Sequence, residues 1–158
     1  MRRLGLMLVV AALGALAIGV VRQPVGAAAA TSCIKLNRIH YDSKGADTGS
    51  NASLNGEWIR VKSFCSGSRN LMGFEIRDGA GNSYTFGSFT LAAGATVKLR
   101  SGKGTNTPAN RYWGRTNYVW GNTKDTARFY DASSSLVQTC SYNSSAVNAY
   151  GCPAGGYL

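Results

Sequence analysis

The stretch Glu57-Trp58-Ile59-Arg60-Val61-Lys62-Ser63-Phe64 decides the fold class, because its apolar and charged residues alternate. Ile59 and Val61 alternate with Arg60 and Lys62, which is the period of a strand with one buried and one exposed face. Glycine and asparagine precede the stretch, and serine and glycine follow it. It therefore predicts a half-buried β-strand.

Short β-favouring runs separated by Gly, Asn, Asp and Ser occur on both sides of this stretch. In the first run the apolar phase slips between Leu36 and Ile39, which predicts a β-bulge. No long amphipathic helical pattern follows the N-terminal segment, so the sequence predicts an all-β domain of the sandwich or barrel kind. The further predicted strands cover residues 34–41, 71–77, 84–86, 96–100, 126–130 and 136–142.

The N-terminus has the three parts of a secretory signal peptide. Arg2 and Arg3 precede an apolar run over residues 4–21, and small residues follow at 25–30. We expect cleavage after Ala30 and secretion of a single domain over residues 31–142, with a tail over 143–158 and no membrane contact once cut. An uncleaved membrane anchor is the alternative, because the apolar run is long enough to span a bilayer.

The mature part is basic. Three of the 17 Lys and Arg residues lie in the signal, so 14 remain against 7 acidic residues, a net charge of +7. The basic residues are scattered singly from Lys35 to Arg128, which is typical of a solvated surface. The charge also favours acidic partners such as anionic cell-wall polymers, lipid head groups or nucleic acid.

Four cysteines remain after cleavage, at positions 33, 65, 140 and 152, and export into an oxidising compartment predicts two disulfides. If residues 33–65 form two paired strands, Cys33 and Cys65 lie near enough to bond, which leaves Cys140 for Cys152. Three connectivities are possible, and the rival pairing joins Cys65 to Cys140 and Cys33 to Cys152. His40 is the single histidine and no Cys-x-x-Cys pair occurs, so we expect no zinc site and no other cofactor.

Several segments in order resemble the lamin tail domain of secreted bacterial proteins. The resemblance covers about residues 34–142 and departs from the family at Lys124, where glycine is usual. It implies an immunoglobulin-like β-sandwich and no shared catalytic residues. The segments are residues 38–42, 45–51, 54–59, 70–78, 84–86, 91–97, 112–115, 119–120 and 125–131.

Residues for catalysis are few. A nucleophile needs a positioned base, and His40 lies in a predicted strand with its side chain expected to project outward. Five of the seven acidic residues lie in predicted turns, where aspartate commonly accepts backbone N–H groups; these are Asp42, Asp47, Asp78, Asp125 and Asp131. We therefore expect no enzyme, and a small secreted hydrolase is the remote alternative.

An aromatic block is the candidate binding surface. Its residues could stack on sugar rings or bases if exposed, or close one end of the sandwich if buried; they are Arg111, Tyr112, Trp113, Arg115, Tyr118 and Trp120. Trp58 is expected to pack in the core or on a sheet face. In the loop over residues 42–55, Asp42, Asp47, Ser50, Asn51 and Asn55 could hold Ca²⁺, but their spacing fits no EF-hand.

The function expected from the sequence is a secreted, monomeric, non-catalytic binding or scaffold module that contacts a cell-surface polymer or protein. The alternative is a basic nucleic-acid-binding module. The net charge and the arginine-flanked aromatic residues favour this alternative.

Overall fold

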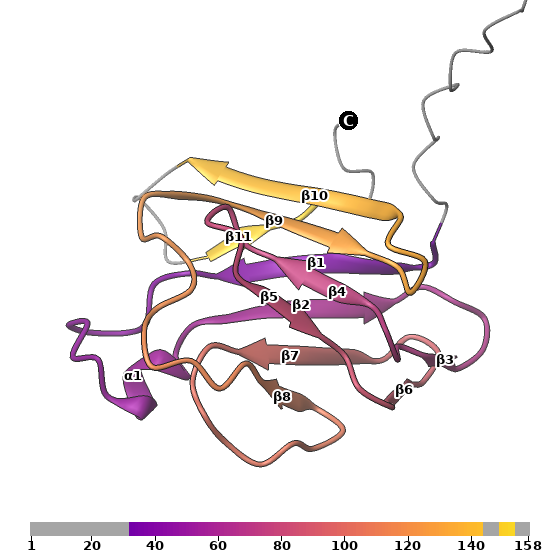
Figure 1. The fold of residues 1–158 in the computed structure, drawn as a ribbon, viewed down its shortest axis with the longest axis horizontal. Helices are drawn as coiled ribbons and strands as arrows, with labels where there is room; N and C mark the ends of the chain where they lie inside the picture. The colour runs from indigo at the N-terminus through magenta and orange to yellow at the C-terminus, as the bar shows by residue number, and fades with distance from the viewer. Residues whose placement is uncertain (1–31, 144–148, 154–158) are drawn as a thin grey trace, which may run out of the picture.

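A computed structural model describes residues 32–143 and 149–153 of the chain. The predicted signal peptide and its cleavage point at Ala30 lie outside the described residues. Two β-sheets stack face to face with one short helix at the side (Figure 1). The elements are β1 Ile34–His40, α1 Asn51–Leu54, β2 Trp58–Ser63, β3 Arg69–Asn70, β4 Glu75–Arg77, β5 Ser83–Thr85, β6 Thr90–Leu91, β7 Thr96–Arg100, β8 Asn110–Tyr112, β9 Lys124–Tyr130, β10 Leu136–Asn143 and β11 Ala149–Gly151.

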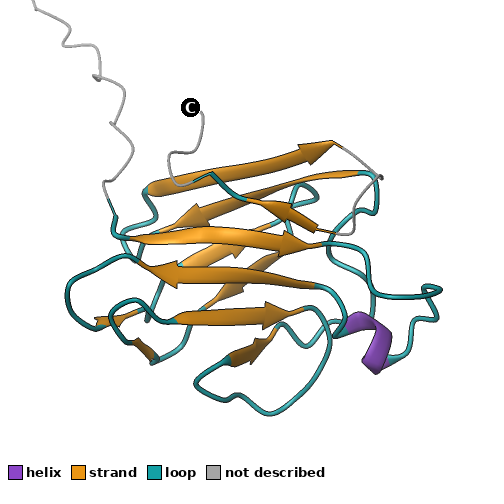
Figure 2. Cartoon of the chain, turned by 180° about the vertical axis from the view of Figure 1, so that it is seen from behind, coloured by secondary structure: helices purple, strands orange, loops and turns teal. Residues whose placement is uncertain are grey.

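The larger sheet has the strand order β11-β1-β2-β7-β8, and the smaller has the order β10-β9-β4-β5. All their pairings are antiparallel except β7 with β8. β3 and β6 form a separate two-stranded ribbon. This is the all-β, immunoglobulin-like sandwich that the sequence predicted. Figure 2 shows the larger sheet from its outer side.

The core lies between the inner faces of the two sheets, which alternate with the outer faces along each strand. In β2, Ile59 and Val61 are fully buried while Trp58, Arg60 and Lys62 are partly exposed, as the alternation predicted. The other sheet contributes Ile76, Ala127 and Phe129 among others to the same cluster.

The predicted bulge in β1 is confirmed, because the register with β2 shifts between Leu36 and Arg38. Gln138 of β10 satisfies the backbone there: its Oε1 accepts the Leu36 N–H at 2.7 Å and its Nε2 donates to the Leu36 carbonyl at 3.2 Å. Gln138 is buried, so these hydrogen bonds satisfy backbone groups that water cannot reach. The bulge places Arg38 and His40 on the outer face while Ile39 still points inward.

The sequence missed the helix α1 and the strands β3, β6, β8 and β11. α1 starts because the Ser50 side chain accepts the Ser53 N–H, and its short length gives no periodic signal. β11 pairs with β1 through Arg38 and Gly151, so the C-terminal tail is held by backbone pairing as well as by its cysteine. No helix among residues 32–143 and 149–153 is long and apolar enough to span a bilayer.

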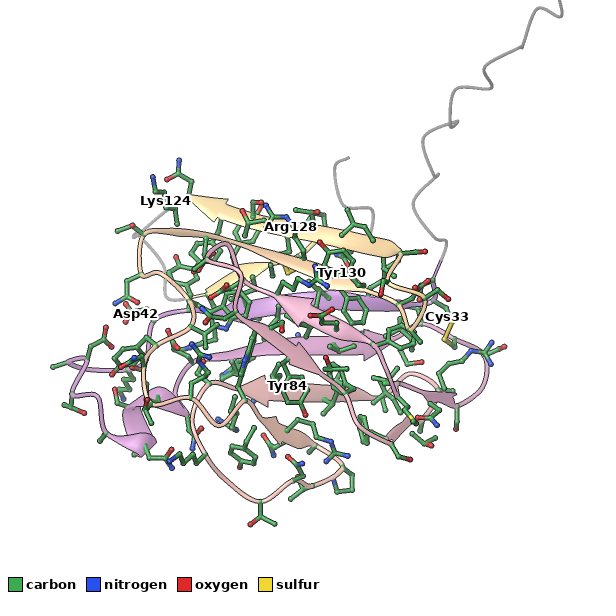
Figure 3. The ribbon with its side chains drawn as sticks, viewed as in Figure 1. Cys33, Asp42, Tyr84, Lys124, Arg128 and Tyr130 are labelled. Carbon is green, nitrogen blue, oxygen red and sulfur yellow. A yellow bond between two sulfur atoms is a disulfide. The ribbon has the colours of Figure 1, made fainter. Side chains whose placement is uncertain are left out.

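Two disulfides join Cys33 to Cys65 and Cys140 to Cys152, with Cα–Cα distances of 5.0 and 5.4 Å. This is the pairing favoured from the sequence, and it rests on the predicted pairing of β1 with β2. Disulfides of this kind are compatible with an extracellular protein. Figure 3 shows Cys33 at one end of the sandwich and Asp42 at the other.

The Cys140–Cys152 disulfide fixes β11 against the edge of the larger sheet, so its removal should loosen that strand first. It closes a loop of 12 residues, and a loop that short places its contribution near the lower end of the usual range, on the order of 2 kcal/mol. For Cys140→Ser with Cys152→Ser we expect this loss in urea unfolding and faster amide exchange at residues 149–151. Unchanged exchange there would show that backbone pairing alone holds β11.

Candidate functional site

The outer face of the larger sheet gathers most of its basic side chains. Strand alternation points every second residue of β1, β2 and β7 away from the core. At these positions the side chains are partly or fully exposed, while their neighbours Ile59, Val97 and Leu99 are buried. We call these outward residues the basic face; they are Lys35, Arg38, His40, Trp58, Arg60, Lys62, Thr96, Lys98 and Arg100.

Cations of the basic face lie directly opposite one another across adjacent strands. Lys35 is in register with Lys62, Arg38 with Arg60, and Arg60 with Lys98. Like charges in such positions destabilise a sheet, because their side chains stand only about 5 Å apart.

No acidic residue occurs in any of the five strands of the larger sheet. The one ion pair found in the described part of the chain joins Arg77 and Glu75 on the other sheet, at 2.7 Å. Arg100 is held by neutral partners, since its Nε donates to Asn110 and its NH1 to the Asn55 carbonyl. The basic face therefore carries uncompensated positive charge.

Trp58 lies within the basic face and is covered by its neighbours. Its ring stacks on His40 at 5.2 Å between centroids, and the Lys98 ammonium lies 4.4 Å from the ring centroid. Partial burial lowers the pKa of Lys98, and the nearby Arg100 and Arg60 lower it further. Burial likewise lowers the pKa of His40, and Arg38 adds to this effect while Asp42 opposes it. Neighbouring positive charges of the basic face thus lower the pKa of both Lys98 and His40.

The aromatic block predicted as a binding surface is mainly structural. Trp120 is 1 % exposed and lies in the core, which agrees with the alternative that the block closes the sandwich, because the chain after β8 turns the indole inward. Trp113 is half-buried and packs its ring against Tyr84 and Trp120, with centroids 5.9 and 6.0 Å apart. The pair closes one side of the sandwich.

The other residues of the block are already engaged. Arg111 lies over the Phe89 ring, 3.8 Å from its centroid, and Arg115 donates to the Asn82 side chain. Tyr118 hydrogen-bonds Ser53 at 2.6 Å and accepts the Gly49 N–H. A Cβ on Gly104 would lie 2.4 Å from the Tyr112 ring, so the backbone there packs closely on the tyrosine. These contacts tie loops together and leave no continuous aromatic platform.

The polar loop over residues 42–55 uses its oxygens on the protein itself. Asp47 accepts from Ser43 and from Asn122, while the side chains of Asn51 and Asn55 both bond the Lys103 backbone. No group of three His, Cys, Asp or Glu side chains in the described ranges could hold a metal ion. Of the oxygens suggested as calcium ligands, those of Asp47 and Asn51 thus accept from neighbouring groups, while Asn55 Oδ1 has no hydrogen-bond partner among the described residues.

Three of the five aspartates predicted to lie in turns accept backbone N–H groups, although Asp125 lies in β9, and Asp47 accepts from side chains instead. Asp78 accepts from Asn82, Asp131 from Ser133 and Ser135, and Asp125 from Gly79, Gly121 and Thr126.

Asp125 also lines a hollow of about 410 Å³ beside β9, next to Lys124 and Arg128. Figure 3 shows Lys124, Arg128 and Tyr130 spread along that strand. Asp125 supplies the one carboxylate that lines the hollow, and this carboxylate accepts backbone N–H groups. The hollow therefore has no acid–base pair.

Comparison with known proteins agrees with the fold. The model of the Lamin Tail Domain family (LTD) matches residues 27–144, which is most of the chain. The comparison with curated proteins found no match to this chain. Members of this family are non-catalytic immunoglobulin-like modules of binding or scaffold type, which agrees with the two-sheet architecture. The chain belongs to the lamin tail domain family.

Proposed function

We propose that this protein is an exported, non-catalytic module that binds an anionic cell-surface polymer through its basic face. One observation carries the proposal: Arg38, Arg60 and Lys98 lie in register across three strands of a sheet that contains no acidic residue. Such a face attracts a polyanion and gains stability when the polyanion neutralises it. The signal-like N-terminus and the two disulfides support an extracellular site of action.

A polymer fits the face better than a small anion. Its cations are spread over β1, β2 and β7, and the outward side chains between them are partly exposed. A linear chain that carries repeated charges can meet several of these cations at once. Each neutralised charge releases counterions, so the affinity must fall steeply with salt.

Retention of the secreted chain on immobilised dextran sulfate tests this proposal, with neutral dextran as the reference matrix. We expect retention at about 50 mM salt and loss at about 500 mM salt. Replacing Arg38, Arg60 and Lys98 by Gln should lower the affinity at least about tenfold and reduce the salt slope by about 2, because each contact contributes about 0.7–0.9. The triple variant should remain folded, since it removes repulsion within the sheet.

A matched control separates the basic face from net charge. Lys44, Arg69 and Lys124 are exposed and lie outside the larger sheet, so replacing all three by Gln changes the charge equally. This control should bind almost as the wild type does. Equal losses in both triple variants would show that binding follows net charge alone and would contradict a defined surface.

A further inference from the structure

The basic face has no free aromatic platform, although a tryptophan lies within it. Trp58 stands on β2, and His40 and Lys98 reach its ring from β1 and β7, the strands on either side. Side chains on a sheet stand roughly perpendicular to it, so the two neighbours cover opposite sides of the indole. A planar ligand would have to displace one of them before it could stack.

The cations, in contrast, form a row in which Arg38 is exposed, while Arg60 and Lys98 are partly exposed and lie next to the Trp58 ring. Arg38, Arg60 and Lys98 are consecutive partners across three strands spaced about 4.8 Å apart, so the row is about 10 Å long and runs perpendicular to the strands. Lys35 and Lys62 form a shorter parallel row about 7 Å further along the strands. Beyond Arg38 the next strand contributes Gly151, where an added Cβ would meet nothing within 4 Å. Within the described residues, the position of Gly151 therefore leaves space at the Arg38 end of the row.

From this arrangement, which rests on the proposed function, we infer that the basic face recognises the backbone of a phosphodiester polymer. The polymer crosses the strands along Arg38, Arg60 and Lys98 and makes no stacking contact with Trp58. A phosphodiester suits the row because its two unesterified oxygens can each accept from a cation of a neighbouring strand. Arginine, at two of the three positions, presents planar forked donors that match phosphate oxygens.

If the face recognises only the phosphodiester backbone, the bases of a nucleic acid contribute nothing to the affinity. This differs from the usual binding of single-stranded nucleic acid. There, bases stack on exposed aromatic rings and each stacked base strengthens binding severalfold. With both sides of Trp58 covered, such a gain is absent. The same row should then hold a poly(glycerol phosphate) chain and a nucleic acid strand alike, because both present repeated phosphodiesters.

The test compares three fluorescent oligomers that have the same number of phosphates: oligothymidine, its abasic counterpart and poly(glycerol phosphate). We expect their dissociation constants for the secreted chain to agree within about threefold. Arg60→Gln should weaken all three about fivefold, and Arg69→Gln, on the exposed ribbon β3, should leave them unchanged.

Other results overturn the inference. An abasic oligomer that binds at least about fivefold more weakly than oligothymidine would show base stacking. Binding of the two deoxyribose oligomers without poly(glycerol phosphate) would show that the sugar is read. Retention on dextran sulfate with no binding of any phosphodiester would refute the inference alone, whereas failure on dextran sulfate as well would also refute the proposed function.

Discussion

Trp120→Ala should destabilise the domain by about 4 kcal/mol, a large fraction of the stability of a domain of this size. Trp120 is 1 % exposed and packs edge-on against Trp113 within the core cluster. Truncation would remove the largest fully buried side chain and leave a cavity that the surrounding strands fill only in part. The measurement is urea unfolding followed by tyrosine fluorescence or circular dichroism.

Two companion variants identify the cause of that loss. Trp120→Phe should cost less than the alanine variant, because it keeps a ring in the cavity and removes an indole N–H that has no hydrogen-bond partner among the described residues. Trp113→Ala should also cost less, because Trp113 is only half-buried. If Trp120→Ala instead left the stability unchanged and abolished capture by dextran sulfate, the indole would be a binding residue and its burial would be wrong.

The sequence predicted the sandwich well because the local pattern of burial determines it. In β2 the alternation of Ile59 and Val61 with Arg60 and Lys62 predicts which face is buried, whatever the neighbouring strand. The slip between Leu36 and Ile39 likewise predicts the bulge in β1 from local phase alone. Very short strands such as β6 and β8 were missed because two or three residues carry no periodic signal.

The candidate site could not be predicted in the same way, because it depends on which strands are neighbours. Lys35, Arg60 and Lys98 are far apart in the sequence, and each is an ordinary polar residue of an alternating strand. The register of β1, β2 and β7 brings them together, so charges that look dispersed along the chain form one face. For the aromatic block, the sequence did not determine whether the side chains are exposed. The residue types are the same whether Trp120 faces solvent or the core.

Glu57 is a buried carboxylate next to β2, and its burial was not predicted from the sequence. It shares the inward phase of Ile59 and Val61, and it is 0 % exposed in the structure. Its Oε2 accepts the Val119 N–H at 3.0 Å, directly before Trp120. The carboxylate thus holds the backbone that carries Trp120 into the core.

Burial raises the pKa of Glu57 to about 7, although the N–H groups of Val119 and Trp120 and the Ser101 hydroxyl act in the opposite direction. A raised pKa means that the folded state binds the proton more tightly than the unfolded state. The contribution of this group to the free energy of unfolding is therefore fully present below its ordinary pKa of 4.5 and is lost as the pH rises through about 7. A shift of this size corresponds to a loss on the order of 3 kcal/mol.

Glu57→Gln should remove this pH dependence, because the amide does not ionise. We expect the difference in unfolding free energy, wild type minus variant, to fall by on the order of 3 kcal/mol between about pH 4 and pH 8. Taking the difference cancels the titration of groups common to both proteins that do not interact with Glu57, such as His40. The curves are best measured by urea unfolding at closely spaced pH values and constant salt.

Glu75→Gln is the matched control, because its carboxylate titrates with the opposite sign. The Arg77 guanidinium holds the pKa of Glu75 below its ordinary value, so the contribution of Glu75 is present at neutral pH and is lost as the pH falls. The wild-type minus variant difference should therefore rise with pH for Glu75 and fall for Glu57. If the Glu57→Gln curve ran parallel to that of the wild type, the carboxylate would titrate normally, and it could not be buried against the Val119 backbone as the structure places it.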